Sequence, residues 1–282
     1  MSQELPLHVT EIAPSDGRQS GPDLETFVLL HGYAGNSFGW RHWVQALAAR
    51  GRVVLVDMKG FGDAPKPDDG RYDPVHLATL IAELLHRRAL ENVTLIGHSL
   101  GGGIALLTTL ILQDQGERRI RRLTVVAGAA YRQRLPPFVA LARRPRLSAA
   151  LIRMVGARFI IRRALLAIVH DRETVSDDQV EAYSAPLDDP DGVRALLDVG
   201  RQIVPENIDV WSSRYAEIDV PALLLWGRQD RVVPLAIGRR LQAGLPNAHL
   251  EILDGCGHMP PEELPEASLA ILETFLDAHP TG

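Results

Sequence analysis

The sequence has one cysteine, few aromatic residues and no strong excess of charge of either sign. A single cysteine, Cys256, among 282 residues excludes an intramolecular disulfide framework, which fits a reducing compartment. The net charge of −5 at pH 7 is not the basic balance typical of nucleic-acid-binding proteins, so we expect no nucleic-acid partner. No uninterrupted apolar stretch approaches about 18 residues, so we expect no transmembrane segment.

Targeting, metal-binding and phosphate-binding signals are also missing. The N-terminal stretch MSQELPLHVTEIAPSDG carries acidic residues and lacks the basic start and apolar core of a signal peptide, so we expect a cytoplasmic protein. The histidines and Cys256 show no paired ligand spacing, which predicts no metal site. The stretch GHSLGGG at 97–103 lacks the lysine and the spacing of a phosphate loop, and we expect no cofactor.

What the sequence does contain is a series of short apolar runs, most of them followed by a turn and a helical pattern. The predicted strands are 25–32, 52–57, 92–97, 121–128, 221–227 and 249–255, and the predicted helices of the core are 40–51, 74–90, 101–113, 234–244 and 268–279. Continuously apolar strands are buried on both faces, which predicts an α/β fold with a mostly parallel, doubly wound sheet of about seven or eight strands. The alternating stretch 5–13 predicts an antiparallel edge strand.

The alternation of strands and helices stops between residues 131 and 211. This segment has no convincing strand and several helical patterns, for example LIRMVGARFIIRRALLAIV at 151–169. We therefore expect residues 1–130 and 212–282 to form the α/β core and residues 131–211 to form a helical insertion. The Gly- and Pro-rich stretch MKGFGDAPKPDDG at 58–70 predicts irregular structure.

A serine lies at the centre of a glycine-rich turn, Ser99 in LIGHSLGGG, two residues after the predicted strand 92–97. In a parallel sheet, ligands bind beyond the carboxyl ends of the strands. Gly97 and Gly101 flank the serine, as required where a strand turns sharply into a helix, so Ser99 is the predicted nucleophile. The structural alternative is that Ser99 only caps the helix.

A serine hydroxyl is a poor nucleophile unless a base takes its proton. The predicted base is His258, because its loop follows the last strand and so lies at the same edge of the sheet. The alternative base is His98, which adjoins the serine but should point elsewhere on so tight a turn. His31, in HGYAG, is expected to connect loops by hydrogen bonds.

The base needs a carboxylate that orients it. Asp230 follows the predicted strand 221–227 by a few residues and is our candidate. Asp57 also ends a strand but comes before the serine, and Asp254 lies only four residues before His258. The chain order serine, aspartate, histidine is the one expected for a strand–turn–helix nucleophile.

The tetrahedral intermediate of acyl transfer needs two hydrogen-bond donors for its oxyanion. One predicted donor is the backbone N–H of Leu100, the residue after the nucleophile. The other is the backbone N–H of Tyr33, because HGYAG follows the first strong strand and lies at the active edge of the sheet. The structural alternative for HGYAG is a simple turn.

Together these residues resemble the α/β-hydrolase fold family. The matching stretches run in family order: VLLHGYAGNSFGW, VVLVDMKGFGDAPKP, VTLIGHSLGGGIAL, LLLWGRQDRVVP and LDGCGHMPPEELPE. The resemblance implies a Ser99–His258–Asp230 triad and a helical lid at 131–211. Relatives that open epoxides or remove halides carry aspartate at the position of Ser99, which argues against those chemistries.

The resemblance leaves the substrate open. We expect hydrolysis of carboxylic esters of small to medium apolar substrates through an acyl-enzyme on Ser99. The closest alternative is a C–C bond hydrolase of a ring-cleavage-type diketone acid, which would need basic or amide groups for the substrate carboxylate. A more distant alternative is a small-molecule receptor on the same fold, and a homodimer is a possible assembly.

Arginine is distributed unevenly along the chain. Residues 118–170 contain thirteen arginines and no acidic residue or lysine, whereas 171–191 are rich in acids. One interpretation is that two solvated helix faces pair with each other. The other is a basic lid surface that attracts anionic substrates or lies against an anionic membrane.

Overall fold

The computed structural model describes residues 4–15, 17 and 24–281, so residues 1–3 and 16 of the N-terminal stretch MSQELPLHVTEIAPSDG lie outside the described residues. Within the described residues, one seven-stranded sheet has the order β1-β3-β2-β4-β5-β6-β7. Its strands are β1 (His8–Ile12), β2 (Thr26–Leu30), β3 (Arg52–Asp57), β4 (Val93–His98), β5 (Ile120–Val126), β6 (Ala222–Gly227) and β7 (Ala248–Leu253). Only β1 is antiparallel to its neighbour, β3, so the predicted parallel sheet and its antiparallel edge strand are confirmed.

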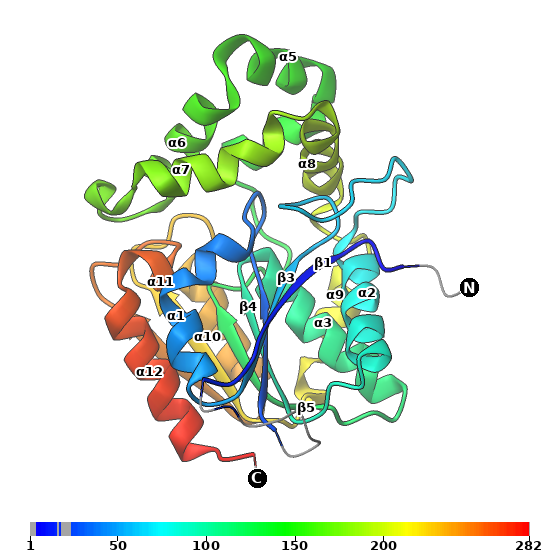
Figure 1. The fold of residues 1–282 in the computed structure, drawn as a ribbon, viewed down its shortest axis with the longest axis vertical. Coiled ribbons are helices and arrows are strands. Elements are labelled where there is room, and N and C mark those ends of the chain that lie inside the picture. The colour runs from blue at the N-terminus through cyan, green and yellow to red at the C-terminus, as the bar shows by residue number, and fades with distance from the viewer. Residues whose placement is uncertain (1–3, 16, 18–23, 282) are drawn as a thin grey trace.

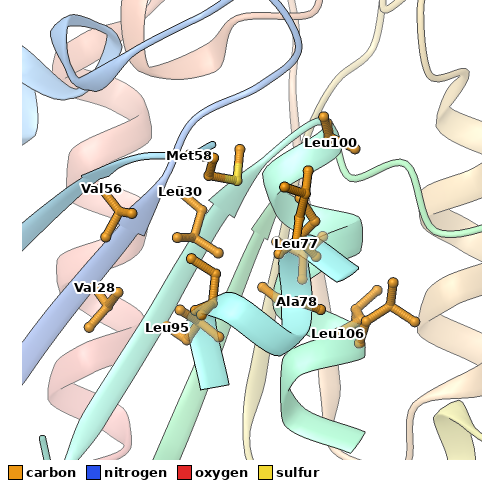
Figure 2. Close-up of a cluster of buried hydrophobic side chains, with 14 of the residues drawn as sticks. Val28, Leu30, Val56, Met58, Leu77, Ala78, Leu95, Leu100 and Leu106 are labelled. Atoms are coloured by element: carbon orange, nitrogen blue, oxygen red, sulfur yellow. The ribbon is translucent and has the colours of Figure 1, made fainter. Parts of the chain in front are cut away.

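Helices cover both faces of this sheet (Figure 1). Helices α1 (Arg41–Ala48) and α12 (Pro265–Ala278) pack on one face, and α2 (Pro74–Arg87), α3 (Leu100–Asp114) and α10 (Leu235–Gly244) pack on the other. Successive side chains of a strand point to opposite faces. Accordingly, Phe27 and Leu29 of β2 lie in the core under α1 and α12, whereas Val28 and Leu30 lie in the core under α2 and α3 (Figure 2).

Helix α2 illustrates how the sequence fixes a helix that supports the site. Asp73 caps its N-terminus, and the carboxylate accepts the N–H groups of Val75 (3.1 Å) and His76 (3.0 Å). Pro74 occupies the first turn, where it costs no hydrogen bond. The buried stripe of α2, which includes Leu77, packs against α3, the helix that begins directly after Ser99.

Residues 131–211, here termed the helical segment, connect β5 to β6 and contain no strand. Its helices are α4 (Pro137–Ala140), α5 (Pro145–Val155), α6 (Ala157–Ile168), α7 (Asp177–Ser184), α8 (Pro190–Gln202) and α9 (Ile208–Ser212). Helices α5 to α8 lie beyond one end of the sheet (Figure 1). The single helical pattern at 151–169 is divided at Gly156, whose φ of +92° is a conformation that other residues rarely adopt.

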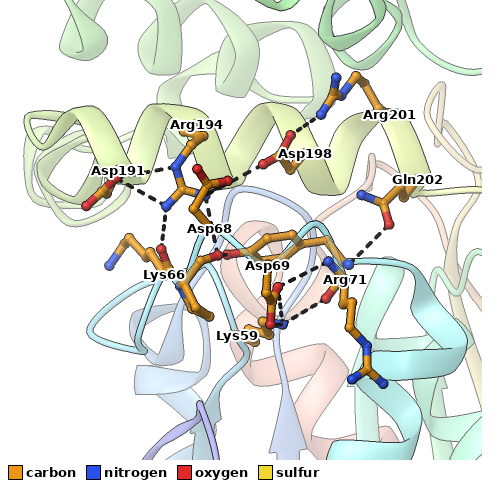
Figure 3. A network of polar contacts seen from close by, with 12 residues as sticks. Lys59, Lys66, Asp68, Asp69, Arg71, Asp191, Arg194, Asp198, Arg201 and Gln202 are labelled. Carbon is orange, nitrogen blue, oxygen red and sulfur yellow. Dashed lines mark hydrogen bonds and ion pairs between the residues drawn. The ribbon is translucent and has the colours of Figure 1, made fainter.

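Helix α8 is attached to the irregular loop that follows β3 (Figure 3). The Arg194 guanidinium donates to the carbonyl oxygen of Lys66 (2.5 Å), and the backbone N–H of Tyr72 donates to Oε1 of Gln202 (3.1 Å). These bonds join opposite ends of α8 to the core. The loop itself has no helix or strand over 58–70, as predicted.

Candidate active site

Ser99 lies at the turn between β4 and α3 with φ +53° and ψ −114°, a backbone conformation that is strained for a residue with a Cβ. A Cβ on Gly97 would collide with the carbonyl of Gly101, and a Cβ on Gly101 would collide with the carbonyl of Leu30. The two glycines are therefore required by close backbone approach. Although Ser99 occupies the N-cap position, its side chain makes no capping hydrogen bond, which excludes the simple capping role.

The Ser99 hydroxyl instead belongs to a chain of buried hydrogen bonds. Its Oγ lies 2.9 Å from Nε2 of His258, and Nδ1 of His258 lies 2.8 Å from Oδ2 of Asp230. The other oxygen, Oδ1, accepts the N–H groups of Val232 (2.8 Å) and Val233 (2.9 Å). Because the carboxylate can only accept, Nδ1 carries the proton and Nε2 is free to accept the serine proton.

His98 does not face the serine hydroxyl. Its Nε2 lies 2.8 Å from the carbonyl oxygen of His258, to which it donates, and the two rings lie 4.9 Å apart. Burial, reinforced by the neighbouring His258, lowers the pKa of His98 to about 3. His98 is therefore neutral near pH 7 and supports the His258 backbone, so the alternative of His98 as the base is not supported.

His31 connects loops, as expected. Its Nδ1 donates to the carbonyl of Gly32 (2.8 Å), and its Nε2 accepts the N–H of Met58 (3.0 Å). Burial lowers the pKa of His31, which keeps the ring neutral in this arrangement. The HGYAG loop is thus tied to the end of β3.

The two predicted oxyanion donors belong to backbone next to Ser99. Leu100 is the first residue of α3, so its N–H has no acceptor within that helix. A Cβ on Gly32 would lie 3.1 Å from Cβ of Ser99, which shows how closely the HGYAG loop passes the serine. The Tyr33 hydroxyl donates to the carbonyl of Leu196 in α8 (2.9 Å) and holds this loop against the helical segment.

A buried carboxylate that sequence reasoning did not single out supports the His258 loop. Oε1 of Glu263 accepts the N–H of Met259 (2.9 Å), and Oε2 accepts the N–H of Gly257 (2.9 Å). Oε2 also accepts the N–H of His170, after α6 (2.6 Å). Glu263 therefore fixes both neighbours of His258 and joins them to the helical segment.

The sequence profile of the alpha/beta hydrolase fold matches residues 25–265. The chain belongs to the α/β-hydrolase fold family. It is 29% identical over 245 residues to the uncharacterized hydrolase YugF of Bacillus subtilis (strain 168), with 87% of each chain covered.

Two further relatives of this α/β hydrolase are informative. It is 31% identical to the 2-hydroxy-6-oxononadienedioate/2-hydroxy-6-oxononatrienedioate hydrolase 2 of Pseudomonas putida, over 90% of this chain and 86% of the relative. The crystal structure of an alpha/beta hydrolase fold protein from Burkholderia ambifaria superposes with a TM-score of 0.79 at 26% identity, covering 94% of this chain and 93% of the other. The family and the names of relatives support hydrolase activity.

A cavity of about 220 Å³ lies over Ser99, between the core and the helical segment of this α/β hydrolase. Its walls are mainly aliphatic, and the helical segment contributes Val139, Ile152, Ile161, Leu165, Ile168 and Leu197. No arginine or lysine from the described part of the chain lines the cavity. The arginines of 118–170 therefore point elsewhere.

The polar groups of the cavity wall are largely engaged with the protein. The amide of Asn36 donates to the carbonyl of Ala182 (2.7 Å) and accepts the N–H of Phe38 (3.1 Å). Gln133 differs, because its Oε1 is buried and finds no partner among the described residues. Among the described residues, the cavity wall thus includes amide side chains but no arginine or lysine.

Glu262 also lines the cavity and connects it to α7. Its Oε1 accepts the hydroxyl of Tyr183 (2.7 Å), its Oε2 accepts the amide of Gln179 (2.9 Å), and Arg41 of α1 forms an ion pair with it. Burial raises the pKa of Glu262 although all three partners oppose the shift. This buried polar cluster therefore connects the core to the helical segment by hydrogen bonds and an ion pair. Sequence patterns did not indicate it.

The remaining candidates have other roles. Asp57 accepts the backbone and hydroxyl protons of Ser37 and the N–H of Asp63, so it organises the loops near the site. Asp254 is exposed and pairs with Arg228. No cluster of potential metal ligands and no helix able to cross a bilayer occurs within the described residues.

Proposed function

We propose that this α/β hydrolase cleaves carboxylic esters of small to medium apolar substrates through an acyl-enzyme on Ser99. The observation that carries the proposal is the chain of hydrogen bonds from Ser99 through His258 to Asp230 beneath a mainly apolar cavity. The described residues place no arginine or lysine in the wall of this cavity. Burial of all three side chains keeps water from competing for these bonds.

In the proposed reaction, Oγ of Ser99 attacks the ester carbonyl carbon while Nε2 of His258 takes the serine proton. The carbonyl oxygen becomes an oxyanion that accepts the N–H groups of Leu100 and Tyr33. His258 then gives its proton to the departing alcohol, which leaves the acyl group on Ser99. A water molecule, deprotonated by His258, releases the acid and restores the serine, while Asp230 stabilises the imidazolium in both steps.

The helical segment serves as the lid in this proposal. Its aliphatic side chains form much of the cavity wall and would bury the acyl or alcohol group of an apolar ester. Tyr33 and Glu263 belong to the loops around the catalytic residues, and each forms a hydrogen bond with the helical segment. In this proposal, closure of the cavity is therefore coupled to alignment of the reacting groups.

Cleavage of a C–C bond is the second candidate, favoured by relatives whose names describe hydrolysis of dienedioates. A dioate carries two carboxylates, and both lose their hydration on entering an apolar cavity. This loss costs free energy unless cations or hydrogen-bond donors of the protein compensate for it. Here the cavity wall has no arginine or lysine among the described residues, and it includes the carboxyl group of Glu262. The Asn36 amide in the wall already donates to the carbonyl of Ala182. We therefore rank ester hydrolysis above cleavage of a diketone acid.

The test is hydrolysis of p-nitrophenyl esters, from acetate to a long acyl chain, by the native chain and Ser99→Ala. We expect multiple turnovers by the native chain, a preference for an acyl length that fills the cavity, and no turnover above background by Ser99→Ala. Ser213→Ala, at an exposed serine of the turn after α9, is the matched control and should retain activity.

Two results would refute the proposal. Turnover of ring-cleavage diketone acids with none of the esters would identify the C–C hydrolase instead. Binding of a small molecule with at most one hydrolytic event per chain would identify a receptor on the same fold.

A further inference from the structure

The stretch from η2 (Leu141–Arg143) through α5 to the start of α6 exposes a concentration of apolar side chains. Of the seven large hydrophobic residues exposed within the described ranges, all but Val210 lie between residues 141 and 159. These six are Leu141, Leu147, Leu151, Met154, Val155 and Phe159, and we term them the outer patch. Met154 is 79% exposed and Phe159 57%. In Figure 1, α5 lies at the extreme end of the molecule, away from the sheet.

Arginines without acidic partners lie around the outer patch. Arg143, Arg144, Arg146, Arg153 and Arg163 are exposed, and no residue that the structure describes forms a hydrogen bond or ion pair with their side chains. Residues 118–170 also contain no acid. The outer patch is therefore accompanied by positive charges that form no ion pair within the described part of the chain.

The other arginines of α6 behave differently. Arg158 pairs with Glu181 and Asp177 of α7, and Arg162 pairs with Asp177. The pairing of two helix faces, one of the two interpretations of the arginine-rich sequence, thus accounts for the α6–α7 contact. It does not account for the arginines of η2 (Leu141–Arg143) and α5, which need a different explanation.

Charge and apolarity together identify the kind of surface that would cover the outer patch. A second copy of the chain would bring arginines against arginines in a two-fold interface, and this repulsion disfavours self-association. An anionic lipid surface offers phosphate groups to the guanidinium groups and an acyl boundary to the apolar side chains. Helix α5, with Ile152 buried on its inner face and Met154 exposed, has the amphipathic form suited to lying in that interface.

The outer patch also reaches the rim of the cavity. Leu141 and Leu151 are exposed and line the cavity as well, so the cavity opens next to the outer patch. We propose that the outer patch and its arginines bind this protein to an anionic phospholipid membrane, with the cavity rim facing the lipid. Membrane binding is independent of the proposed ester hydrolysis, but it would let an apolar substrate pass from lipid to cavity with little exposure to water.

The experiment is flotation of the full chain with vesicles of phosphatidylcholine alone and of equimolar phosphatidylcholine and phosphatidylglycerol. We expect partition onto the anionic vesicles that weakens with added salt, and little onto the neutral ones. Ser99→Ala should bind as the native chain does, so that failure of the proposed catalysis and failure of membrane binding are distinguishable.

Two pairs of substitutions separate charge from apolar contact. Arg146→Gln with Arg153→Gln should lower the partition coefficient about fivefold per arginine. Met154→Ser with Phe159→Ser should lower it about tenfold or more. The matched controls are Arg239→Gln, at an exposed arginine of α10, and Val210→Ser, and both should bind like the native chain.

Three outcomes would overturn the proposal: no binding to anionic vesicles, equal binding to both vesicle types, or binding that neither pair of substitutions weakens. Sedimentation provides a further check, because a dimer that Met154→Ser dissociates would assign the outer patch to a second copy of the chain. Thermal unfolding of each variant confirms that it is folded, and these exposed side chains should alter the midpoint little.

Discussion

Replacement of Glu263 by glutamine tests how the His258 loop is held. The Glu263 carboxylate accepts three N–H groups, from His170 and Gly257 at Oε2 and from Met259 at Oε1. Glutamine has one carbonyl oxygen, so its amide N–H groups must face at least one of these donors. In the better orientation of the glutamine amide, its oxygen accepts the N–H groups of His170 and Gly257, and the Met259 N–H is left unpaired. The two remaining hydrogen bonds are weaker because their acceptor no longer carries a negative charge.

The expected cost follows from this count of hydrogen bonds. One buried unpaired N–H costs about 1–3 kcal/mol, and weaker bonds to a neutral acceptor add to it, so the free energy of unfolding should fall by about 2–3 kcal/mol. For a chain of this length, the thermal midpoint should fall by roughly 4–10 °C. Because Gly257 and Met259 flank His258, kcat should fall about 10–100-fold with a smaller change in KM.

The assays are thermal unfolding by circular dichroism and steady-state hydrolysis of the preferred p-nitrophenyl ester. Glu266→Gln is the matched control, because Glu266 is exposed in the first turn of α12, and it should change neither quantity appreciably. A Glu263→Gln variant with the midpoint and kcat of the control would refute the reasoning. A lowered midpoint with unchanged kcat would refute the positioning of His258 while leaving the structural role intact.

Three further substitutions probe the site. Asp230→Asn should preserve the fold and lower kcat by about 10⁴-fold, measured by ester hydrolysis, because the amide favours the wrong tautomer of the base. The pKa of His98 falls from 6.5 to about 3 in the folded chain, so its contribution to stability is complete above pH 6.5 and declines as pH falls toward 3. His98→Gln should therefore reduce the pH dependence of the unfolding free energy below pH 6.5, by at most about 1.4 kcal/mol per pH unit in urea titrations. Gly32→Ala should lower kcat by about tenfold or more, because its Cβ would press on Ser99 beside the predicted oxyanion donors.

The sheet was predictable from the sequence because burial on both faces leaves a continuous apolar signal. Strands such as β2 and β6 are buried along their whole length, and the runs predicted at 25–32 and 221–227 contain them. The prediction that Ser99, Asp230 and His258 share one edge of the sheet needed only that each follows a parallel strand.

Other features depend on tertiary geometry and could not be predicted in the same way. Helices α5 and α6 have compatible apolar spacing, so periodicity over 151–169 did not reveal the break at Gly156. The roles of Glu263 and His98 rest on contacts with backbone N–H and C=O groups, whose positions composition and spacing do not specify. Likewise, sequence could not separate Arg158 and Arg162 of α6, which are paired, from the unpaired arginines of α5.

The positive φ of Ser99 makes this position a thermodynamic trade-off between activity and stability. A residue with a Cβ in such a conformation costs about 1–3 kcal/mol, and that cost remains when the hydroxyl alone is removed. Glycine would relieve it at an entropic cost of about 0.5–1 kcal/mol. Of two equally inactive proteins, Ser99→Gly should therefore unfold at a higher temperature than Ser99→Ala, and the difference would measure the conformational strain that the fold retains to present a nucleophile.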